Sequence, residues 1–487
     1  MFLDNFLDNF FDRYYTVQMG TSPNLKITFC GGVEDVTGSR HLIESSNARV
    51  LMDCGLFQGH RRQALDKNKS FPFDAAKIDA VLLSHAHIDH CGNLPLLVKL
   101  GFRGKIHCTQ PTLDLVSIML MDSAHLQEED AKFFNKIHQD SGEKIEPLYG
   151  EEEVRRCLSL FVPHDYENFF EVATEMRAQF LDAGHVLGSA IVELQAGIGA
   201  LMRRIIFTGD LGRRQNILMS APKVPEHADY LILESTYGAR KHEALKEAET
   251  QLEKIIQEAI KEKGKILIPS FALERTQEII FLLAKLVRQN KIPKIPLYID
   301  SPMATKITEI FERYPESFSP QAKEELEKQQ DWQRHQPIYF TRSVEESKAL
   351  TEVSGPILIL SASGMCEGGR ILHHLRNNID KPSTTILIVG YQVPGTLGRQ
   401  LVDGSKKVKI FGLNHTVMAQ VTRIASFSAH ADQDDLWWFV KSIRPAPKKI
   451  FLVHGDKTNR PALAEFLRDN AIPQTEIPTY NQSFELE

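Results

Sequence analysis

The sequence lacks the features that mark membrane and secreted proteins. No apolar run approaches the length that a bilayer-spanning helix needs, and no basic stretch opens the chain as in a signal peptide. The six cysteines include no C-x-x-C pair, which argues against a structural zinc knot and against a disulfide framework; they are Cys30, Cys54, Cys91, Cys108, Cys157 and Cys366. We therefore expect a cytoplasmic protein with reduced cysteines and no membrane association.

Excess positive charge is also absent, since the formal net charge is −6. A polyanionic substrate would therefore have to meet a local basic surface and not a basic protein as a whole. The hydrophobic content of 42% and the charged content of 25% are typical of a globular protein. A chain of 487 residues is too long for one ordinary core, so we expect two domains.

A dense group of metal-competent side chains follows the apolar run from Ala80 to Leu83. His85, His87, Asp89 and His90 lie within six residues there, and so many polar groups beside a core strand need a common partner. Side chains two apart in an extended segment share one face, so the first two histidines can bind one ion while the turn directs the others toward a second. A chance histidine-rich loop is the alternative, which the complete H-x-H-x-D-H pattern disfavours.

The same construction recurs, because four further apolar runs each end in a residue that can bind metal or a proton. These residues are His185, Asp210, Glu234 and His454. Taken singly each is weak evidence, since Gly-Asp after a strand is usually a turn. Together they predict that several strands finish at one shared edge, where these groups converge.

From Leu25 onward, short apolar runs alternate with amphipathic segments, which is typical of layered α/β proteins. The strand before His454 comes after a second α/β stretch, so we predict that this stretch is inserted into the first domain. The predicted domains are 24–235 plus 420–487, with 236–419 as the insertion. Residues 1–23 are an N-terminal extension that could be disordered or dock a partner; we favour a non-essential extension.

With these motifs combined, the chain resembles the β-CASP ribonucleases of the metallo-β-lactamase superfamily, similar to the cleavage subunit of the eukaryotic pre-mRNA 3′-end machinery. The resemblance covers about Lys26 to Gln474. It implies an α/β fold, a metallo-β-lactamase αββα sandwich with an inserted α/β β-CASP domain. It also implies seven ligands for two Zn²⁺ ions, with Mn²⁺ as the alternative metal: His85, His87, Asp89, His90, His185, Asp210 and His454.

The resemblance assigns further roles around these ligands. Asp210 matches the bridging carboxylate, and Asp53 matches an aspartate that supports the cluster without binding metal. The reaction it implies is hydrolysis of RNA phosphodiesters by metal-bound hydroxide. The catalytic residues would be Asp89, Glu234 and His430. Of these, His430, held by Glu234, would donate a proton to the departing 3′ oxygen.

A glycine-rich turn after a strand, Ser361 to Arg370, is the predicted place for RNA phosphate. Exposed backbone N–H groups at such a helix start can hold phosphate, although a glycine-rich turn is more often only a tight turn. The predicted RNA contacts are Ser361, Ser363, Gly364, Gly368, Gly369, Arg370 and Arg399, with Lys406 and Lys407 as further candidates. We assign His373 and His374 to helix surface and packing and not to metal binding.

Other functions stay open at this point. A thioester hydrolase or lactonase of the same fold would share the metal motifs without requiring the inserted unit. A DNA nuclease is closer, but its branch of the family tends to carry valine where this chain has His454. A non-catalytic RNA-binding protein is disfavoured because every expected ligand is present. The expected partner is single-stranded RNA; the sequence leaves open homodimerisation and whether cleavage is internal or from an end.

Overall fold

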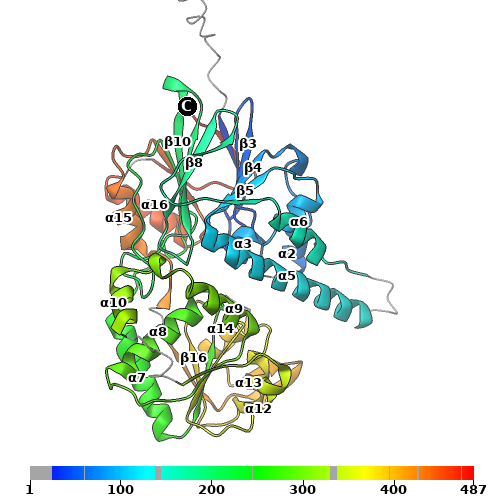
Figure 1. Ribbon diagram of the computed structural model, residues 1–487, viewed down its shortest axis with the longest axis vertical. Coiled ribbons are helices and arrows are strands. Elements are labelled where there is room, and N and C mark those ends of the chain that lie inside the picture. Colours follow the sequence, from blue (N-terminus) through cyan, green and yellow to red (C-terminus); the bar gives the residue numbers. More distant parts are fainter. Residues whose placement is uncertain are drawn as a thin grey trace, which may run out of the picture.

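The structure, a computed structural model, describes residues 25–59, 61–137, 144–243, 245–328, 337–393, 395–424, 427–472 and 474–487. Two β-sheets form its upper half in Figure 1, and a third sheet lies in the lower half. The long helix α5 (Gln110–Ile137) crosses between the halves. The predicted N-terminal extension, 1–23, lies outside the described residues.

The first sheet has the order β22-β1-β2-β3-β4-β5-β6. Its strands are β1 (Lys26–Gly31), β2 (Arg40–Glu44), β3 (Arg49–Met52), β4 (Ala80–Leu82), β5 (Lys105–Cys108), β6 (Phe161–Pro163) and β22 (Ser483–Glu485). Strands β3 to β6 run parallel, so the carboxyl ends of β3 and β4 lie next to each other. This places the residue after β3, Asp53, beside the histidine-rich turn that follows β4.

The second sheet has the order β21-β20-β11-β10-β9-β8-β7. Its strands are β7 (Phe170–Ala173), β8 (Met176–Asp182), β9 (Ala190–Ala196), β10 (Arg203–Phe207), β11 (Tyr230–Glu234), β20 (Lys449–Val453) and β21 (Thr475–Glu476). Strand β9 is antiparallel to both β8 and β10, while β10, β11 and β20 are parallel. The carboxyl ends of β8, β10, β11 and β20 therefore lie at one edge of this sheet.

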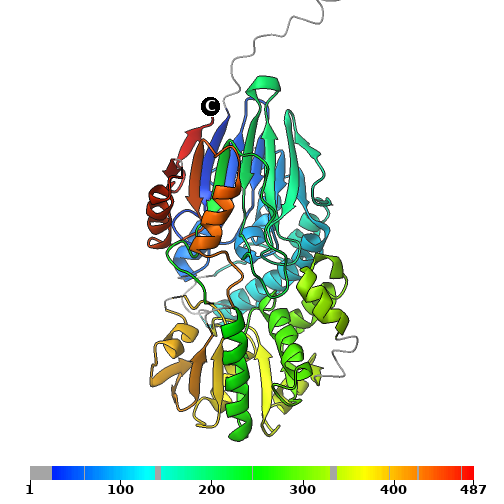
Figure 2. The ribbon, with the colours of Figure 1, turned by 90° about the vertical axis from the view of Figure 1, so that its left-hand side faces the viewer.

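An apolar core fills the space between these two sheets, with Phe29, Phe180, Phe207 and Phe451 among its buried rings. Helices cover the outer faces (Figure 2). On the first sheet these include α4 (Leu94–Lys99), α5 and α6 (Glu151–Leu158), whereas α15 (Gln433–Ser442) and α16 (Asn459–Asp469) cover the second. The result is the predicted αββα sandwich.

The third sheet is entirely parallel, with the order β14-β13-β15-β12-β16-β19. Its strands are β12 (Lys265–Pro269), β13 (Leu297–Ile299), β14 (Ile338–Phe340), β15 (Ile357–Ser361), β16 (Thr385–Ile388) and β19 (Gln420–Arg423). A small hairpin, β17 (Lys407–Ile410) with β18 (Leu413–Thr416), stands apart from it. Because apolar side chains cover both faces of a parallel sheet, the inner strands β12, β15 and β16 are apolar runs, whereas the edge strands β14 and β19 are partly exposed.

The remaining helices connect these strands or flank them. They are α2 (Arg61–Asn68), α3 (Ile88–Cys91), α7 (Leu245–Lys261), α8 (Arg275–Arg288), α9 (Pro302–Phe311), α10 (Pro320–Lys328), α12 (Val344–Ala349), α13 (Ile371–Asn378) and α14 (Leu397–Val402). Among the described residues, none of the helices combines the length and apolarity required to cross a bilayer.

The predicted α/β architecture is confirmed, and the four strands predicted to finish at one edge, β8, β10, β11 and β20, do so. The histidine-rich turn follows β4 of the first sheet, whereas His185, Asp210, Glu234 and His454 lie at strand ends of the second. The functional groups therefore meet where the edges of two facing sheets come together. Strand β20 pairs with β11, although the third sheet lies between them in the chain.

Candidate metal centre

The turn after β4 brings His85 and His87 to the end of the sandwich and continues directly into the short helix α3. Close backbone packing holds this turn in place. A Cβ atom at Gly55 would lie 1.6 Å from the carbonyl oxygen of Asp89, so only glycine fits there. The N–H of Cys54 also donates to the carbonyl of His90, at 2.8 Å. The loop after β3 therefore fixes the histidine-rich turn through its backbone.

Glycines also shape two of the loops that follow the second sheet. Gly184 and Gly209 adopt φ angles of 61° and 53°, in the left-handed region where glycine is unstrained. Each stands next to a predicted ligand, His185 or Asp210. The sharp turns let the chain reverse at the sheet edge with these side chains almost fully buried.

His85, His87 and His185 form what we call the first candidate site. His87 Nδ1 lies 3.0 Å from His85 Nε2 and 3.4 Å from His185 Nε2. Since β4 and β8 belong to different sheets, the fold brings these rings together across the sandwich.

Asp89, His90 and His454 form the second candidate site. The Nε2 atoms of His90 and His454 are 3.2 Å apart, and His454 Nε2 is 3.5 Å from Asp89 Oδ2. His454 itself adopts a φ of 49°, and a non-glycine residue in this region marks a position that the surrounding structure enforces.

Asp210 lies between the two sites and faces one with each oxygen. Its Oδ2 is 3.5 Å from Nε2 of both His85 and His185. Its Oδ1 is 3.3 Å from His90 Nε2 and 3.2 Å from His454 Nδ1. This arrangement suits a carboxylate that is shared by two ions.

The donor set fits divalent metal ions. Two imidazole nitrogens bound to one tetrahedral ion at about 2.0–2.1 Å are roughly 3.3 Å apart, and the three nitrogen pairs of the candidate sites lie 3.0 to 3.4 Å apart. Neutral imidazoles whose lone pairs converge repel one another unless a cation or proton lies between them. Burial lowers the pKa of His87 to about 3 and also lowers the pKa of His85 and His185, which favours the neutral, metal-binding form.

Asp53 is fully buried and contacts the second candidate site through His90. Its Oδ2 lies 2.6 Å from His90 Nδ1 and accepts from the hydroxyls of Ser84 and Ser39, at 3.0 and 3.2 Å. Its Oδ1 accepts from the N–H of Ser84 at 2.8 Å. An acidic partner on Nδ1 leaves Nε2 of His90 as the free, metal-facing nitrogen.

His430 and Glu234 form a pair at the rim of the cluster. His430 Nδ1 lies 3.1 Å from Glu234 Oε1 and 3.9 Å from Asp210 Oδ2. Glu234 is fully buried and accepts from the N–H groups of Leu211 and Thr236. Burial opposes a charge on His430, but the charges of Glu234 and Asp210 prevail and raise its pKa to about 9. His430 is therefore placed to hold a proton beside the two candidate sites.

Comparison with known proteins agrees with this geometry. Residues 36–252 match the profile of the metallo-β-lactamase superfamily, and residues 276–401 match the Beta-Casp domain. Residues 414–476 match the Zn-dependent metallo-hydrolase RNA specificity domain. The chain is 34% identical over 443 residues to ribonuclease TTHA0252 of Thermus thermophilus, covering 91% of this chain and 96% of that protein. The chain belongs to the β-CASP family of the metallo-β-lactamase superfamily.

Archaeal β-CASP proteins are similar as well. The transcription termination factor FttA of Methanosarcina mazei is 31% identical over 451 residues, which cover 89% of this chain and 67% of FttA. FttA of Methanocaldococcus jannaschii is 31% identical over 470 residues, covering 93% and 70%. A crystal structure of a protein of unknown function from Enterococcus faecalis V583 shares the fold, with a TM-score of 0.56 at 14% identity over 95% of this chain and all of that one.

Family membership and the histidine–aspartate cluster together support a divalent metal at this centre. The match to the RNA specificity domain is a finding that sequence reasoning missed, because it treated residues 420–487 as part of the first domain. Our domain boundaries stay predictions.

In this β-CASP protein the predicted RNA-binding turn follows β15 in the third sheet, and Ser361 is fully buried with its hydroxyl donating to the carbonyl of Asp300 at 2.8 Å. Gly368 has open space around it, whereas Gly369 packs against the carbonyl of Ala362. Ser363 Oγ accepts from the N–H of Glu367, and Gly364 packs against the ring of Phe271.

The two predicted arginine contacts differ in their surroundings. Arg370 Nη1 lies 2.7 Å from Oδ1 of the buried Asp300, and His374 Nε2 lies 2.6 Å from its Oδ2. Arg399 instead pairs with Asp403 on the surface. Of the predicted packing residues, His373 is exposed, whereas His374 is buried. Sequence reasoning missed Asp300; its signal was the pair Asp300-Ser301 directly after the apolar strand β13.

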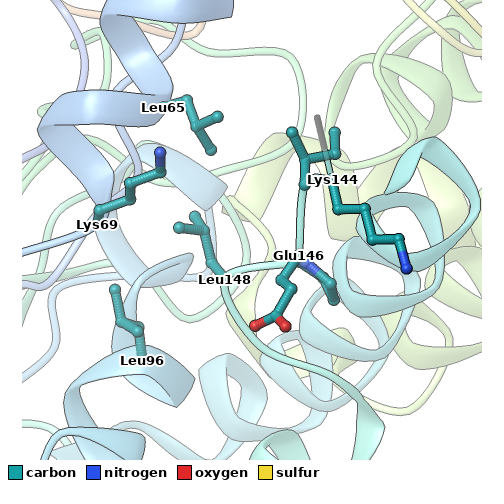
Figure 3. Close-up of a pocket in the computed structure, with 8 residues that line it drawn as sticks. Leu65, Lys69, Leu96, Lys144, Glu146 and Leu148 are labelled. Carbon is teal, nitrogen blue, oxygen red and sulfur yellow. The ribbon is translucent and has the colours of Figure 1, made fainter. Parts of the chain in front are cut away.

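A separate pocket lies between α2, α4 and the segment that follows α5, where the side chains of Leu65, Leu96 and Leu148 approach one another beside Lys69 (Figure 3). Its volume is 250 Å³. It contains none of the predicted site residues, so we assign it no part in the metal centre.

Proposed function

We propose that this protein is a ribonuclease that uses two Zn²⁺ ions to hydrolyse phosphodiester bonds of single-stranded RNA. The observation that carries the proposal is Asp210, which presents one oxygen to each candidate site and so favours a pair of ions over a single one. The RNA preference is supported by the match to the RNA specificity domain and by the name of the Thermus thermophilus relative.

The proposed ligands are His85, His87 and His185 for one ion and Asp89, His90 and His454 for the other, with Asp210 between them. A bound metal pair would activate water at neutral pH and neutralise charge on a phosphate oxygen. The protein would then have to hold the seven proposed ligand side chains in one geometry and to exclude water other than the reacting molecule. The almost complete burial of His85, His90, His185 and Asp210 supports this role.

The proposed proton donor is His430. Its side chain is 22% exposed, which gives a substrate access to the imidazole, while Glu234 is completely buried behind it. Glu234 Oε1 holds Nδ1 of the ring, so the opposite nitrogen, Nε2, is left to face the departing 3′ oxygen. The buried carboxylate also favours the protonated imidazolium that such a donor needs.

The transcription termination factors among the relatives suggest a second cellular context. They do not change the proposed chemistry. Their sequences extend further beyond the matched region than that of the ribonuclease, of which the chain covers 96%. We therefore propose RNA hydrolysis as the activity of this protein. A role in transcription would be a cellular use of that same activity.

The test is to incubate purified protein with single-stranded RNA and DNA of the same sequence, each end-labelled, and to map the products. We expect zinc-dependent cleavage of RNA and none of DNA. Products from a single end would indicate exonucleolytic cleavage, and internal products endonucleolytic cleavage. Binding of RNA without cleavage under any metal condition would overturn the proposal and favour a non-catalytic RNA-binding protein.

The role of His430 is tested with His430→Ala, for which we expect zinc content close to wild type and a loss of about 10²-fold or more in cleavage rate. The matched control is His227→Ala, since His227 pairs with Asp229 away from the cluster and should leave both quantities unchanged. Full activity with full metal occupancy in His430→Ala would remove this residue from the mechanism.

A further inference from the structure

Phe271 is a large apolar side chain that the third sheet leaves 42% exposed. It lies two residues after the end of β12. Strand β12 is flanked by β15, which leads into the glycine-rich turn, and by β16, which leads into Gly390 and Tyr391. Phe271 therefore stands at the carboxyl edge of a parallel sheet, where ligands of such sheets usually bind.

Gly364 makes room for this ring, and Gly390 lies at ordinary contact distance from it. A Cβ atom at Gly364 would lie 2.9 Å from its Cδ2 atom, and one at Gly390 would lie 3.7 Å from its Cε2 atom. The Gly364 loop is tied down, because Gln392 Nε2 donates to the carbonyl of Gly364 at 3.0 Å. The ring of Phe271 therefore packs against the backbone of the Gly364 and Gly390 loops.

The backbone of Phe271 is also held. Its carbonyl accepts from the hydroxyl of Thr276 at 2.8 Å, and the preceding N–H of Ser270 donates to the carbonyl of Ser361 at 3.1 Å. An exposed ring on a fixed backbone loses little conformational entropy when it binds a flat partner.

Among the described residues, two other exposed phenylalanines are covered by cations, whereas Phe133 on α5 is not. Arg376 lies over Phe411, 5.7 Å from its centroid, and Arg177 lies over Phe169 at 4.7 Å. Within the described part of the chain, no cation and no second ring covers Phe271. A bare aromatic face beside the predicted phosphate-binding turn is the kind of surface on which unpaired bases stack.

We infer that Phe271 is the stacking platform for one unpaired base of the RNA strand bound at the metal centre. The inference rests on the proposed function and adds a basis for strand selectivity. A base stacked on Phe271 must be unpaired, so duplex RNA would lose this contact. Stacking would position the strand and not take part in bond cleavage, so Phe271 is a positioning residue.

The test uses a series of single-stranded RNAs, each with one abasic residue placed at a successive position. Binding is measured by fluorescence anisotropy and cleavage by single-turnover kinetics, for wild type and Phe271→Ala. We expect one position at which base removal weakens wild-type binding about 10-fold. In Phe271→Ala the intact RNA should bind about 10-fold more weakly, and base removal at that position should have no further effect.

Two variants separate stacking from packing. Phe271→Tyr keeps the aromatic face and should restore wild-type binding, whereas Phe271→Leu keeps an apolar side chain and should behave like Phe271→Ala. The matched control is Phe133→Ala on α5, an exposed phenylalanine that should change neither quantity. Equal sensitivity to base removal in wild type and Phe271→Ala at every position would overturn the inference. A wild-type protein that shows the abasic pattern in binding but never cleaves RNA would overturn the proposed function alone.

Discussion

Asp53 and His90 meet at 2.6 Å, with carboxylate Oδ2 against ring nitrogen Nδ1, beneath the second candidate site. Asp53 adopts a φ of 57°, so the backbone accepts an unfavourable conformation to place this carboxylate. Because Nδ1 is engaged, Nε2 of His90 points to the position that His454 and Asp210 also face. The buried carboxylate of Asp53 therefore orients the proposed ligand His90 without binding metal itself.

Replacing Asp53 should therefore weaken metal binding without removing a ligand. We expect Asp53→Ala to lower zinc affinity about 10- to 100-fold, and Asp53→Asn to lower it less, because asparagine still accepts from Nδ1 and tolerates the positive φ. Zinc content after dialysis against a graded series of chelator concentrations measures the effect. Asp74→Ala is the control, since Asp74 caps a short surface helix and pairs with the exposed Lys77. Unchanged zinc affinity in Asp53→Ala would contradict this role.

His41 predicts a dependence of stability on pH. Its ring is fully buried between Phe29 and Phe207, and in the described structure neither nitrogen has a hydrogen-bond partner. Burial lowers the pKa of His41 to about 3. The unfolded chain takes up this proton near pH 6.5. The stability contribution is therefore complete above pH about 6.5 and is lost as the pH falls toward about 3.

His41→Leu should remove this dependence and also two unpaired polar atoms. We expect the variant to be more stable than wild type by about 1 kcal/mol at pH 7.5, with an advantage that grows by up to about 1.4 kcal/mol per pH unit below pH 6. Urea unfolding at pH 7.5, 6.0 and 5.0 measures both quantities. A constant difference across these pH values would show that His41 does not titrate as we expect.

Metal removal should destabilise the whole sandwich, because the clustered imidazoles come from both sheets. At metal concentrations 100 to 1,000 times the dissociation constant, binding to the native state contributes about 3–4 kcal/mol. We expect chelation to lower the thermal midpoint by several degrees and zinc to restore it. Calorimetry with and without chelator measures this, and His87→Ala should start from a lower midpoint and respond less. An unchanged midpoint would mean that the rings keep their places without metal.

Much of this architecture could be predicted from local patterns. The apolar run predicted to end in Glu234 is strand β11, because an apolar run that ends in a carboxylate has few other interpretations. The inserted α/β stretch was also predicted, because the strand before His454 had to return to the first domain.

Long-range pairing was not predictable in the same way. The sequence did not reveal that the histidine-rich turn belongs to a different sheet from the four later strand ends, because local sequence does not encode which of two facing sheets a strand joins. The buried bond between Asp300 and Arg370 links residues 70 positions apart, so spacing gave no sign of it. Phe271 escaped notice because a phenylalanine after an apolar strand resembles core, and only the folded structure reveals that its ring is exposed.

Arg370 and Arg399 were predicted as equivalent phosphate contacts, but their surroundings predict different behaviour. Arg370 and His374 share the buried Asp300, which also accepts from the hydroxyls of Thr341 and Ser347, so removing that carboxylate would take a partner from four polar side chains. Breaking such a buried pair costs about 3–5 kcal/mol. We expect this loss in the unfolding free energy of Asp300→Ala and a smaller loss in Arg370→Ala, measured by urea denaturation.

Arg399 should behave in the opposite way, because its pair with Asp403 is exposed and contributes little to stability. We expect Arg399→Ala to unfold like wild type but to bind single-stranded RNA more weakly, with the slope of log affinity against log salt reduced by about 0.7. Titrations at several salt concentrations measure this slope, and Arg155→Ala, on the outer helix α6, is the control. If instead Arg370→Ala changes the slope while keeping its stability, then the arginine that contacts phosphate is the one beside Asp300.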